Sequence, residues 1–206
     1  MIIRFTAFKR FFLIITISLI LIFLFVNVNF FLKFLYPFPY RDIIYRYSKQ
    51  FDLDPFLVVS VIKVESRFNP YAESQQGALG LMQIMPETAL WVAKNLNVGY
   101  SKEKLFEPEY NIMLGCWYLS NLHSEFKGNL ALVLASYNGG RGNVREWLRT
   151  GQWDGNIDSL EDIPFSETRD FVKKVLKIYD RYKKIYYDRY KKIYNEERER
   201  VVLIGG

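Results

Sequence analysis

The first strong pattern along the chain is an uncharged, apolar run. Residues 11–32 contain no charged side chain, and 18 of these 22 residues are apolar. Because a helix rises about 1.5 Å per residue, such a run could cross a hydrocarbon core of roughly 30 Å. It exceeds the apolar region of a cleaved secretion signal, and Asn27-Val28-Asn29 offers no small-residue cleavage site. The run therefore predicts a single transmembrane helix that serves as an uncleaved signal anchor.

Beyond this run, apolar residues recur mostly at helical spacing. The clearest helix opens at Asp54-Pro55, because Asp is a favoured N-cap residue and proline suits the first helical position. Val61 and Ile62 lie on one face of this helix, Glu65 continues that face, and Asn69-Pro70 ends the helix. We predict an all-α body, with a loop over residues 71–80, an irregular segment over 151–164, and further helices over residues 42–51, 86–95, 109–122, 130–138, 144–149 and 166–194.

Composition excludes several classes of protein and site. Hydrophobic residues make up 50% of the chain and charged residues 24%, which excludes a disordered chain. The single cysteine, Cys116, excludes an internal disulfide and a multi-cysteine metal site, and the single histidine, His123, excludes a His-rich metal centre. At helical spacing from Ile112 and Leu119, Cys116 is expected in the core. His123, near a helix end, is expected at the surface.

The net charge of +6 is concentrated at the two ends of the chain. Residues 1–10 carry three cationic residues and no acid, which predicts a cytoplasmic N-terminal tail and an external remainder. Residues 173–192 carry nine basic residues against two acidic ones, so the rest of the chain has a net charge of −4. This mildly acidic body argues against nucleic-acid binding. We predict five parts: a tail (1–10), an anchor (11–32), a linker (33–41), a domain (42–180) and a basic helical extension (181–206).

The basic extension contains a duplicated segment. Residues 180–187 read DRYKKIYY and residues 188–195 read DRYKKIYN. The period of eight does not sustain a regular supercoil, and two copies are too few for a solenoid. A solvated helix with long Lys and Tyr side chains is the favoured interpretation. Attachment to anionic lipid head groups or to a wall polymer is the alternative.

Glu65 is the strongest candidate for acid–base chemistry. It follows the apolar stretch Val58–Ile62 and precedes a loop with Gly77 and Gly80, so its carboxyl group is expected to be partly desolvated. Desolvation raises the pKa of a carboxyl group and keeps it protonated near neutral pH, as a general acid requires.

Glu65 belongs to the first of four blocks of residues that follow one another along the chain. They are Glu65-Ser66 with Phe68-Asn69-Pro70; Gly77-Ala78 with Gly80-Leu81-Met82-Gln83 and Met85-Pro86; Asn111, Gly115, Tyr118 and Leu119 with Ala135, Tyr137-Asn138 and Gly140; and Pro164, Glu167-Thr168-Arg169, Phe171-Val172 and Val175. In these blocks the sequence resembles the catalytic domain of lytic transglycosylases of the soluble-lytic-transglycosylase type, which have a mainly helical, lysozyme-like fold. The resemblance covers about residues 40–180.

The resemblance assigns roles to single residues. It implies that Glu65 is the catalytic acid and base, that Ser74 orients the N-acetyl group of the reacting sugar, and that Tyr137 lies near the catalytic glutamate. It also implies substrate-binding positions in the glycan cleft for Gln83, Met85, Asn138 and Glu167. It implies no metal and no cofactor. Among the tryptophans, Trp153 is the one that we expect to stack on a sugar.

The implied function is cleavage of the β-1,4 bond between N-acetylmuramic acid and N-acetylglucosamine in peptidoglycan, without water, by an enzyme anchored in the membrane and facing the cell wall. Glycoside cleavage usually takes two carboxyl groups, and the blocks offer one, since Glu73 lies in a loop without an assigned role. The substrate's own N-acetyl group could replace the second carboxylate. Three alternatives remain: a lysozyme-like hydrolase of the same bond, a non-catalytic wall-binding module, and a component of an envelope-spanning machine with unknown protein partners.

Overall fold

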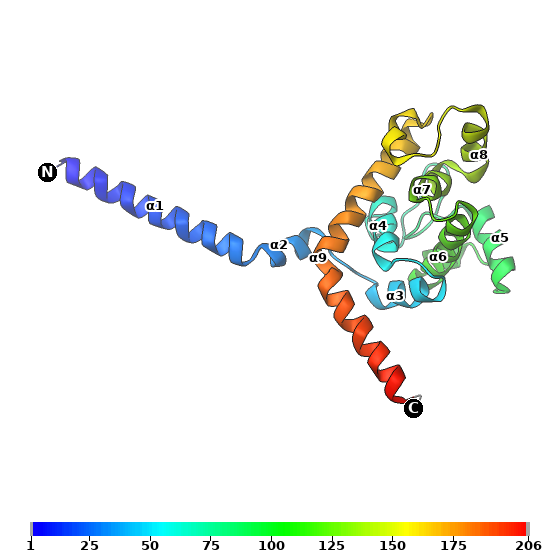
Figure 1. Ribbon diagram of the computed structural model, residues 1–206, viewed down its shortest axis with the longest axis horizontal. Helices are drawn as coiled ribbons and strands as arrows, with labels where there is room; N and C mark the ends of the chain where they lie inside the picture. The colour runs from blue at the N-terminus through cyan, green and yellow to red at the C-terminus, as the bar shows by residue number, and fades with distance from the viewer. Residues whose placement is uncertain (1, 205–206) are drawn as a thin grey trace. The chain divides into compact units, whose positions relative to one another are not determined.

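The computed structural model describes the backbone of residues 2–204 and the side chains of residues 9–25, 27–28 and 30–187. The chain divides into two units. Residues 39–184 form one of them, and the segments before and after it form the other. The described part of the chain is helical and has isolated antiparallel bridges but no strand, which confirms the all-α prediction for the body (Figure 1).

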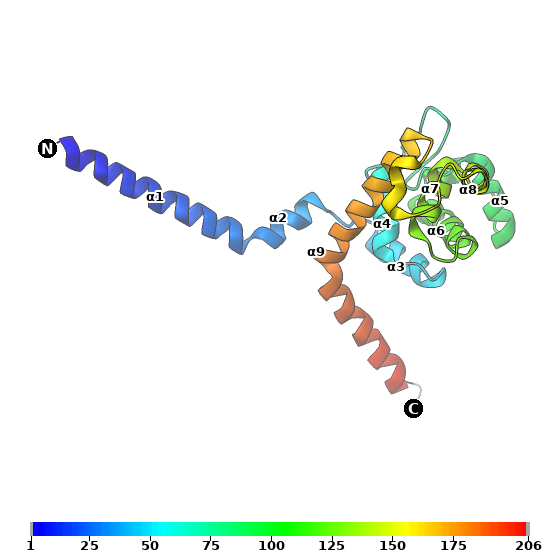
Figure 2. The ribbon, with the colours of Figure 1, turned by 45° about the horizontal axis from the view of Figure 1, so that its top comes forward.

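The unit of residues 39–184 is a cluster of helices (Figures 1 and 2). Its elements in chain order are α3 (Arg41–Gln50), α4 (Pro55–Glu65), α5 (Pro86–Leu96), the 3-10 helix η1 (Glu103–Phe106), α6 (Pro108–Glu125), α7 (Leu130–Gly139), α8 (Arg141–Thr150), the 3-10 helix η2 (Ile157–Asp162) and the first part of α9 (Ser166–Ile204). Helix α6 contacts α3, α5 and α7, and α7 in turn contacts α8.

Helix α4 forms the centre of the core. Asp54 accepts a 2.8 Å hydrogen bond from the backbone N–H of Phe56, and Pro55 occupies the first helical turn, as predicted. Every residue from Pro55 to Ile62 is buried, and not only the residues of one face. A helix that is apolar all round is stable when other elements enclose it on all sides. The one carboxylate of α4, Glu65, is its last residue and is half-buried where the helix leaves this enclosure.

Residues next to the helices set their boundaries, which agree with the predicted one at the start of α7 and differ from it at the start of α8. Asn129 caps α7, because its side-chain oxygen accepts hydrogen bonds from the N–H groups of Ala131 and Leu132. Helix α8 begins at Arg141 and not at residue 144, because Gly140 has a φ of +86° and turns the chain directly from α7 into α8. Glycine adopts this conformation without the steric cost that a side chain brings.

The predicted transmembrane helix is wrong. Among the residues whose side chains the structure describes, no helix combines the length and the apolarity that crossing a membrane requires. The uncharged run of residues 11–32 is divided between α1 (Ile2–Val26) and α2 (Val28–Leu35), which are separated at Asn27. The Asn27 side chain donates to the carbonyl of Phe23, a local bond that competes with regular helix geometry. The uncharged part of α1 spans 16 residues, about 24 Å, and so falls short of the roughly 30 Å hydrocarbon core.

The second unit contains α1, α2 and the end of α9. Here the hydroxyl of Tyr186 donates a 2.8 Å hydrogen bond to the carbonyl of Tyr36, and its ring meets Phe38 edge-on with centroids 5.6 Å apart. The five domain boundaries expected from the sequence stay predictions. Residues 1 and 205–206 of the predicted tail and extension lie outside the described residues, as do the side chains of the second DRYKKIY copy.

Candidate active site

Glu65 is the last residue of α4, and its side chain is partly exposed at the edge of a buried apolar helix. Burial, and secondly the negative charge of Glu167, raise the pKa of its carboxyl group to about 8. Both effects favour the neutral acid, because a desolvated or repelled carboxylate loses stability. Glu65 is therefore protonated at neutral pH and can donate a proton.

Glu167 reaches this position from the first turn of α9. Its own side chain is exposed, so it keeps contact with solvent while its charge acts on Glu65. Two carboxyl groups that are far apart in the sequence are thus close enough for the charge of one to act on the other. The surroundings of the two groups differ, because the Glu65 side chain is half-buried and the Glu167 side chain is exposed.

Tyr137, near the end of α7, is the third member of the group. Its hydroxyl donates a 2.7 Å hydrogen bond to the carbonyl of Met82. Burial, and then the charge of Glu65, raise the pKa of Tyr137 well above its ordinary value. Its ring stacks on Phe171 with centroids 6.4 Å apart and planes inclined by 7°. Tyr137 is therefore held from two sides beside Glu65.

Asn138 links the end of α7 to the start of α9. Its side-chain oxygen accepts a 2.8 Å hydrogen bond from the hydroxyl of Thr168, which is buried. An added Cβ at the neighbouring Gly139 would come within 2.7 Å of that hydroxyl oxygen, so the two helices approach each other closely here. The bond holds the turn of α9 that carries Glu167.

The loop between α4 and α5 is folded by its own backbone bridges. Glu73 pairs with Leu79, and Leu79 pairs with Ile84. The hydroxyl of Ser74 accepts a 3.0 Å hydrogen bond from the N–H of Ala78, and its own proton stays available for another acceptor. Met85, at 41% exposure, presents its side chain to solvent.

Gln83 belongs to the framework of this loop. Its side-chain NH₂ donates to the carbonyls of Ala72 at 3.1 Å and Gly80 at 2.9 Å. Its backbone φ of +47° is in the left-handed region, where non-glycine residues are uncommon. The two side-chain bonds hold this conformation. Its amide oxygen is the group that remains for a ligand.

Asn111 of α6 holds the same loop through hydrogen bonds of its side chain. The sequence pattern assigned it no role. Its fully buried amide accepts from the N–H of Met82 at 2.8 Å and donates to the carbonyls of Leu79 at 2.9 Å and Leu105 at 2.8 Å. An added Cβ at Gly115 would overlap the Met82 sulfur. These contacts fix the position of Met82, whose carbonyl binds Tyr137.

The structure thus brings together three predicted residues, Glu65, Tyr137 and Glu167, through their electrostatic interactions. Ser74, Gln83 and Met85 share the neighbouring loop. The interpretation of Trp153 as a sugar platform is wrong. Its side chain is 1% exposed, and its ring N–H donates to the carbonyl of Asn156, so no ring face is open to a sugar. Cys116 is buried, as expected.

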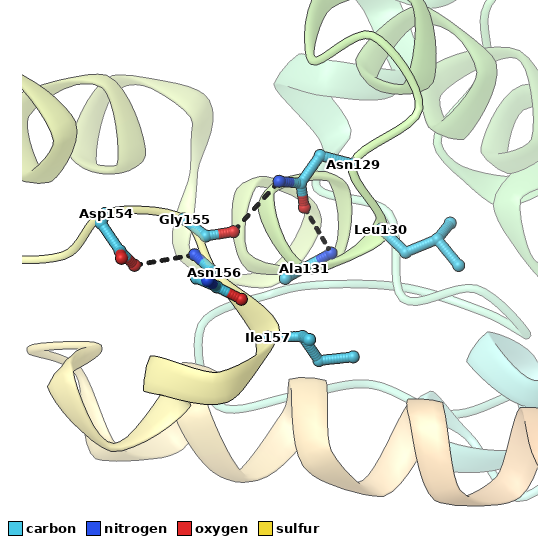
Figure 3. A pocket seen from close by; sticks show the side chains of 7 residues that line it. All are labelled: Asn129, Leu130, Ala131, Asp154, Gly155, Asn156 and Ile157. Atoms are coloured by element: carbon cyan, nitrogen blue, oxygen red, sulfur yellow. Dashed lines mark hydrogen bonds between the residues drawn. The ribbon is translucent and has the colours of Figure 1, made fainter.

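A cavity of about 530 Å³ lies at the start of α7 (Figure 3). Tyr137 is near the other end of this helix. Asn129 forms part of its wall, donating to the carbonyl of Gly155, and Leu130 and Ile157 add apolar side chains. Asp154 accepts a hydrogen bond from the N–H of Asn156 at its rim. None of the predicted site residues lines this cavity.

Comparisons with known proteins identify relatives of this chain. The family model described as "Transglycosylase SLT domain" matches residues 42–159. The soluble lytic murein transglycosylase of Escherichia coli K12 is 40% identical over 156 residues, which cover 73% of this chain and 24% of the relative. The membrane-bound lytic murein transglycosylase C of Edwardsiella ictaluri is 33% identical over 168 residues, 71% of this chain and 47% of the relative.

Solved structures agree with the sequence comparisons. The 70-kDa soluble lytic transglycosylase of Escherichia coli aligns with a TM-score of 0.69 and 37% identity over 74% of this chain and 25% of its own. An inactive mutant of the lytic transglycosylase Slt of Pseudomonas aeruginosa aligns with a TM-score of 0.68 and 36% identity, with the same coverage. The matched region spans about a quarter of the length of these soluble relatives.

Proposed function

Because this chain belongs to the transglycosylase SLT domain family, we propose that it is a peptidoglycan lytic transglycosylase. It cleaves the β-1,4 bond between N-acetylmuramic acid and N-acetylglucosamine and leaves a 1,6-anhydro end on the muramyl residue. The observation that carries the proposal is the state of Glu65, whose pKa of about 8 makes it an acid at neutral pH. In the Pseudomonas relative, an inactive form carries a glutamate-to-glutamine substitution.

The proposed reaction uses Glu65 twice. In the first step its proton passes to the leaving glycosidic oxygen, the bond from this oxygen to the muramyl anomeric carbon breaks, and the N-acetyl oxygen bonds to that carbon. In the second step the Glu65 carboxylate takes the proton of the C6 hydroxyl, whose oxygen bonds to the anomeric carbon as the acetyl oxygen leaves. Glu65 is protonated again and no water is consumed. A pKa near the working pH suits a group that serves as acid and then as base.

The neighbouring residues fit roles in this scheme. The hydroxyl of Tyr137 donates its proton to the carbonyl of Met82. Its oxygen can therefore accept a hydrogen bond from the N–H of the substrate's N-acetyl group. Ser74 uses its oxygen on Ala78 and can donate its proton to the acetyl oxygen. Opposed contacts of this kind orient the acetyl group for attack. The solvated charge of Glu167 keeps the Glu65 proton in place until the leaving oxygen takes it.

The substrate places the activity at the cell wall. Peptidoglycan strands are the proposed binding partner, and Gln83, Met85 and Asn138 are the proposed further contacts or supports of the strand. Relatives with this domain include proteins named soluble and proteins named membrane-bound.

The test is to incubate the full chain with purified peptidoglycan and to weigh the fragments by mass spectrometry. Anhydro ends, lighter than reducing ends by one water, are expected. Glu65→Gln should abolish their release, while the matched Glu73→Gln, which alters an exposed loop carboxylate, should not. Reducing ends would contradict the proposal and identify a lysozyme-like hydrolase. Substantial activity in Glu65→Gln would contradict the role of Glu65.

A further inference from the structure

We propose that Trp91 and Arg141 form an additional subsite that binds a carboxylate-bearing muramyl residue of the strand beside the cleavage point. The inference rests on the proposed function for the identity of the strand. It concerns a part of the substrate that does not react.

The first observation is the stacking of Arg141. Its guanidinium carbon lies 4.8 Å from the ring centroid of Trp91 and 5.5 Å from that of Tyr118. Trp91 is itself held edge-on against Trp117, with centroids 5.0 Å apart. A guanidinium over a ring face keeps its N–H donors in its own plane, and the donors of Arg141 that Tyr118 and Glu125 do not use can bind a carboxylate. The rings therefore hold a cation in a fixed orientation.

The second observation is an imbalance of charge. Glu125 forms ion pairs with two arginines. The nitrogen–oxygen distance is 3.5 Å to Arg141 and 2.8 Å to Arg145. Two cations thus share one carboxylate, and the shorter contact belongs to Arg145. Arg141 keeps the less compensated charge, and its side chain is 31% exposed. A carboxylate from a ligand would complete the pairing, and a bidentate carboxylate suits the guanidinium fork.

The third observation is the exposed indole beside this cation. Trp91 is 37% exposed, although Trp117, Tyr118 and Arg141 cover other parts of its ring. An aromatic ring of this kind offers a large apolar surface against which the C–H face of a sugar can pack. A muramyl residue offers both a sugar ring for Trp91 and, on its substituent, a carboxylate for Arg141. N-acetylglucosamine has no such group.

The fourth observation is continuity with the candidate active site. Tyr118 lies between Trp91, with ring centroids 6.3 Å apart, and Tyr137, at 5.5 Å. Tyr137 in turn is close enough to Glu65 for the charge of Glu65 to raise the pKa of Tyr137. The rings of Trp91, Tyr118 and Tyr137 thus form an unbroken series of contacts that leads toward Glu65. The proposal assigns the exposed end of this series, Trp91, to a neighbouring sugar of a strand bound at Glu65.

The consequence is a preference for strands that bear carboxylates. Binding energy from a part of the substrate that does not react helps to place the reacting bond. The carboxylate can belong to the lactyl group of a peptide-free strand or to a stem peptide. The two sources share the same chemistry at Arg141.

The test measures binding with the full chain carrying Glu65→Gln, so that no strand is cleaved. Three probes are titrated by calorimetry: peptide-free glycan strands, the same strands with amidated lactyl groups, and peptide-bearing strands. In this background, we expect Arg141→Gln to weaken binding of at least one carboxylate-bearing strand about tenfold. The variant should also lose the discrimination against the amidated strand. Trp91→Ala should weaken binding of all three probes.

Arg149→Gln is the matched control, because it removes another exposed cation of α8 that pairs with Glu146 and not with Glu125; discrimination should persist. The ratio of two affinities in one variant is insensitive to a fraction of unfolded protein. Loss of discrimination on peptide-free strands identifies the lactyl carboxylate, and loss on peptide-bearing strands alone identifies the peptide. Equal affinity of the Glu65→Gln parent and its Arg141→Gln variant for all probes would overturn the subsite. Cleavage assays of the unaltered chain test the proposed function separately.

Discussion

The hydroxyl of Tyr137 donates a hydrogen bond of 2.7 Å to the carbonyl of Met82 and so ties α7 to the loop that follows α4. The bond joins two of the sequence blocks across 55 residues. It also leaves the tyrosine oxygen as an acceptor beside Glu65, whose charge raises the pKa of Tyr137. One contact therefore serves both the fold and the candidate site.

Tyr137→Phe removes this bond and keeps the ring. We expect peptidoglycan cleavage to fall by at least tenfold, because the acceptor for the N-acetyl group is lost. The free energy of unfolding should fall by about 1 kcal/mol, since the Met82 carbonyl loses its partner. Tyr110→Phe is the matched control: it deletes a 2.8 Å hydroxyl bond to the Gly99 carbonyl in an exposed region, so cleavage should be unchanged. Equal loss in both variants would contradict the role of Tyr137.

Glu65→Gln should change how stability depends on pH. The pKa of Glu65 is raised from 4.5 to about 8 by folding, so the folded chain binds this proton more tightly than the unfolded chain. The free energy of unfolding therefore falls as pH rises from about 4.5 to 8, by at most about 5 kcal/mol from this group. Glutamine cannot ionise and removes this loss. Urea unfolding should show Glu65→Gln gaining stability over the unaltered chain as pH rises across this range. A constant difference between the two would contradict the shifted pKa.

Glu167→Gln should shift the pH profile of cleavage. Removing the charge that is the second cause of the raised Glu65 pKa lowers that pKa. The first step needs protonated Glu65, so activity is lost as pH rises through its pKa, and in the variant this loss should begin at lower pH. Asp170→Asn removes another exposed carboxylate of α9 that is not among the causes of the shift, and its profile should match the unaltered chain. An unmoved profile in Glu167→Gln would show that its charge does not act on Glu65.

Gly80→Ala should be far more damaging than Gly77→Ala. Both glycines have positive φ, +76° and +86°, so both variants carry backbone strain of about 1 kcal/mol. An added Cβ at Gly77 meets nothing within 4 Å, whereas at Gly80 it overlaps the Leu105 carbonyl and the Asn111 amide. We expect Gly80→Ala to lose several kcal/mol more in thermal or urea unfolding. Similar losses in the two variants would contradict the close packing around Asn111.

Much of the local structure could be predicted from the sequence, because it depends on neighbouring residues. Asp54-Pro55 opens α4 as expected, since N-capping involves groups two residues apart. The apolar stretch before Glu65 predicted a desolvated carboxyl group, and burial does raise its pKa. The single apolar run of residues 11–32 was the exception. Its pattern was apolar throughout, but Asn27 separates α1 from α2, and a count of apolar residues does not register such a break.

Tertiary packing decided which of these residues meet. Only the approach of α9 to α4 places the charge of Glu167 on Glu65, and no periodicity along either helix contains that contact. Packing also buries Trp153 and places the guanidinium of Arg141 over the ring of Trp91. The Gln83 amide donates its hydrogen bonds to carbonyls of its own loop. The sequence by itself determined the helical elements and one acidic candidate, because backbone propensity and apolar spacing act locally. The electrostatics of the site come from side chains far apart in the chain, and only the folded structure brings them together.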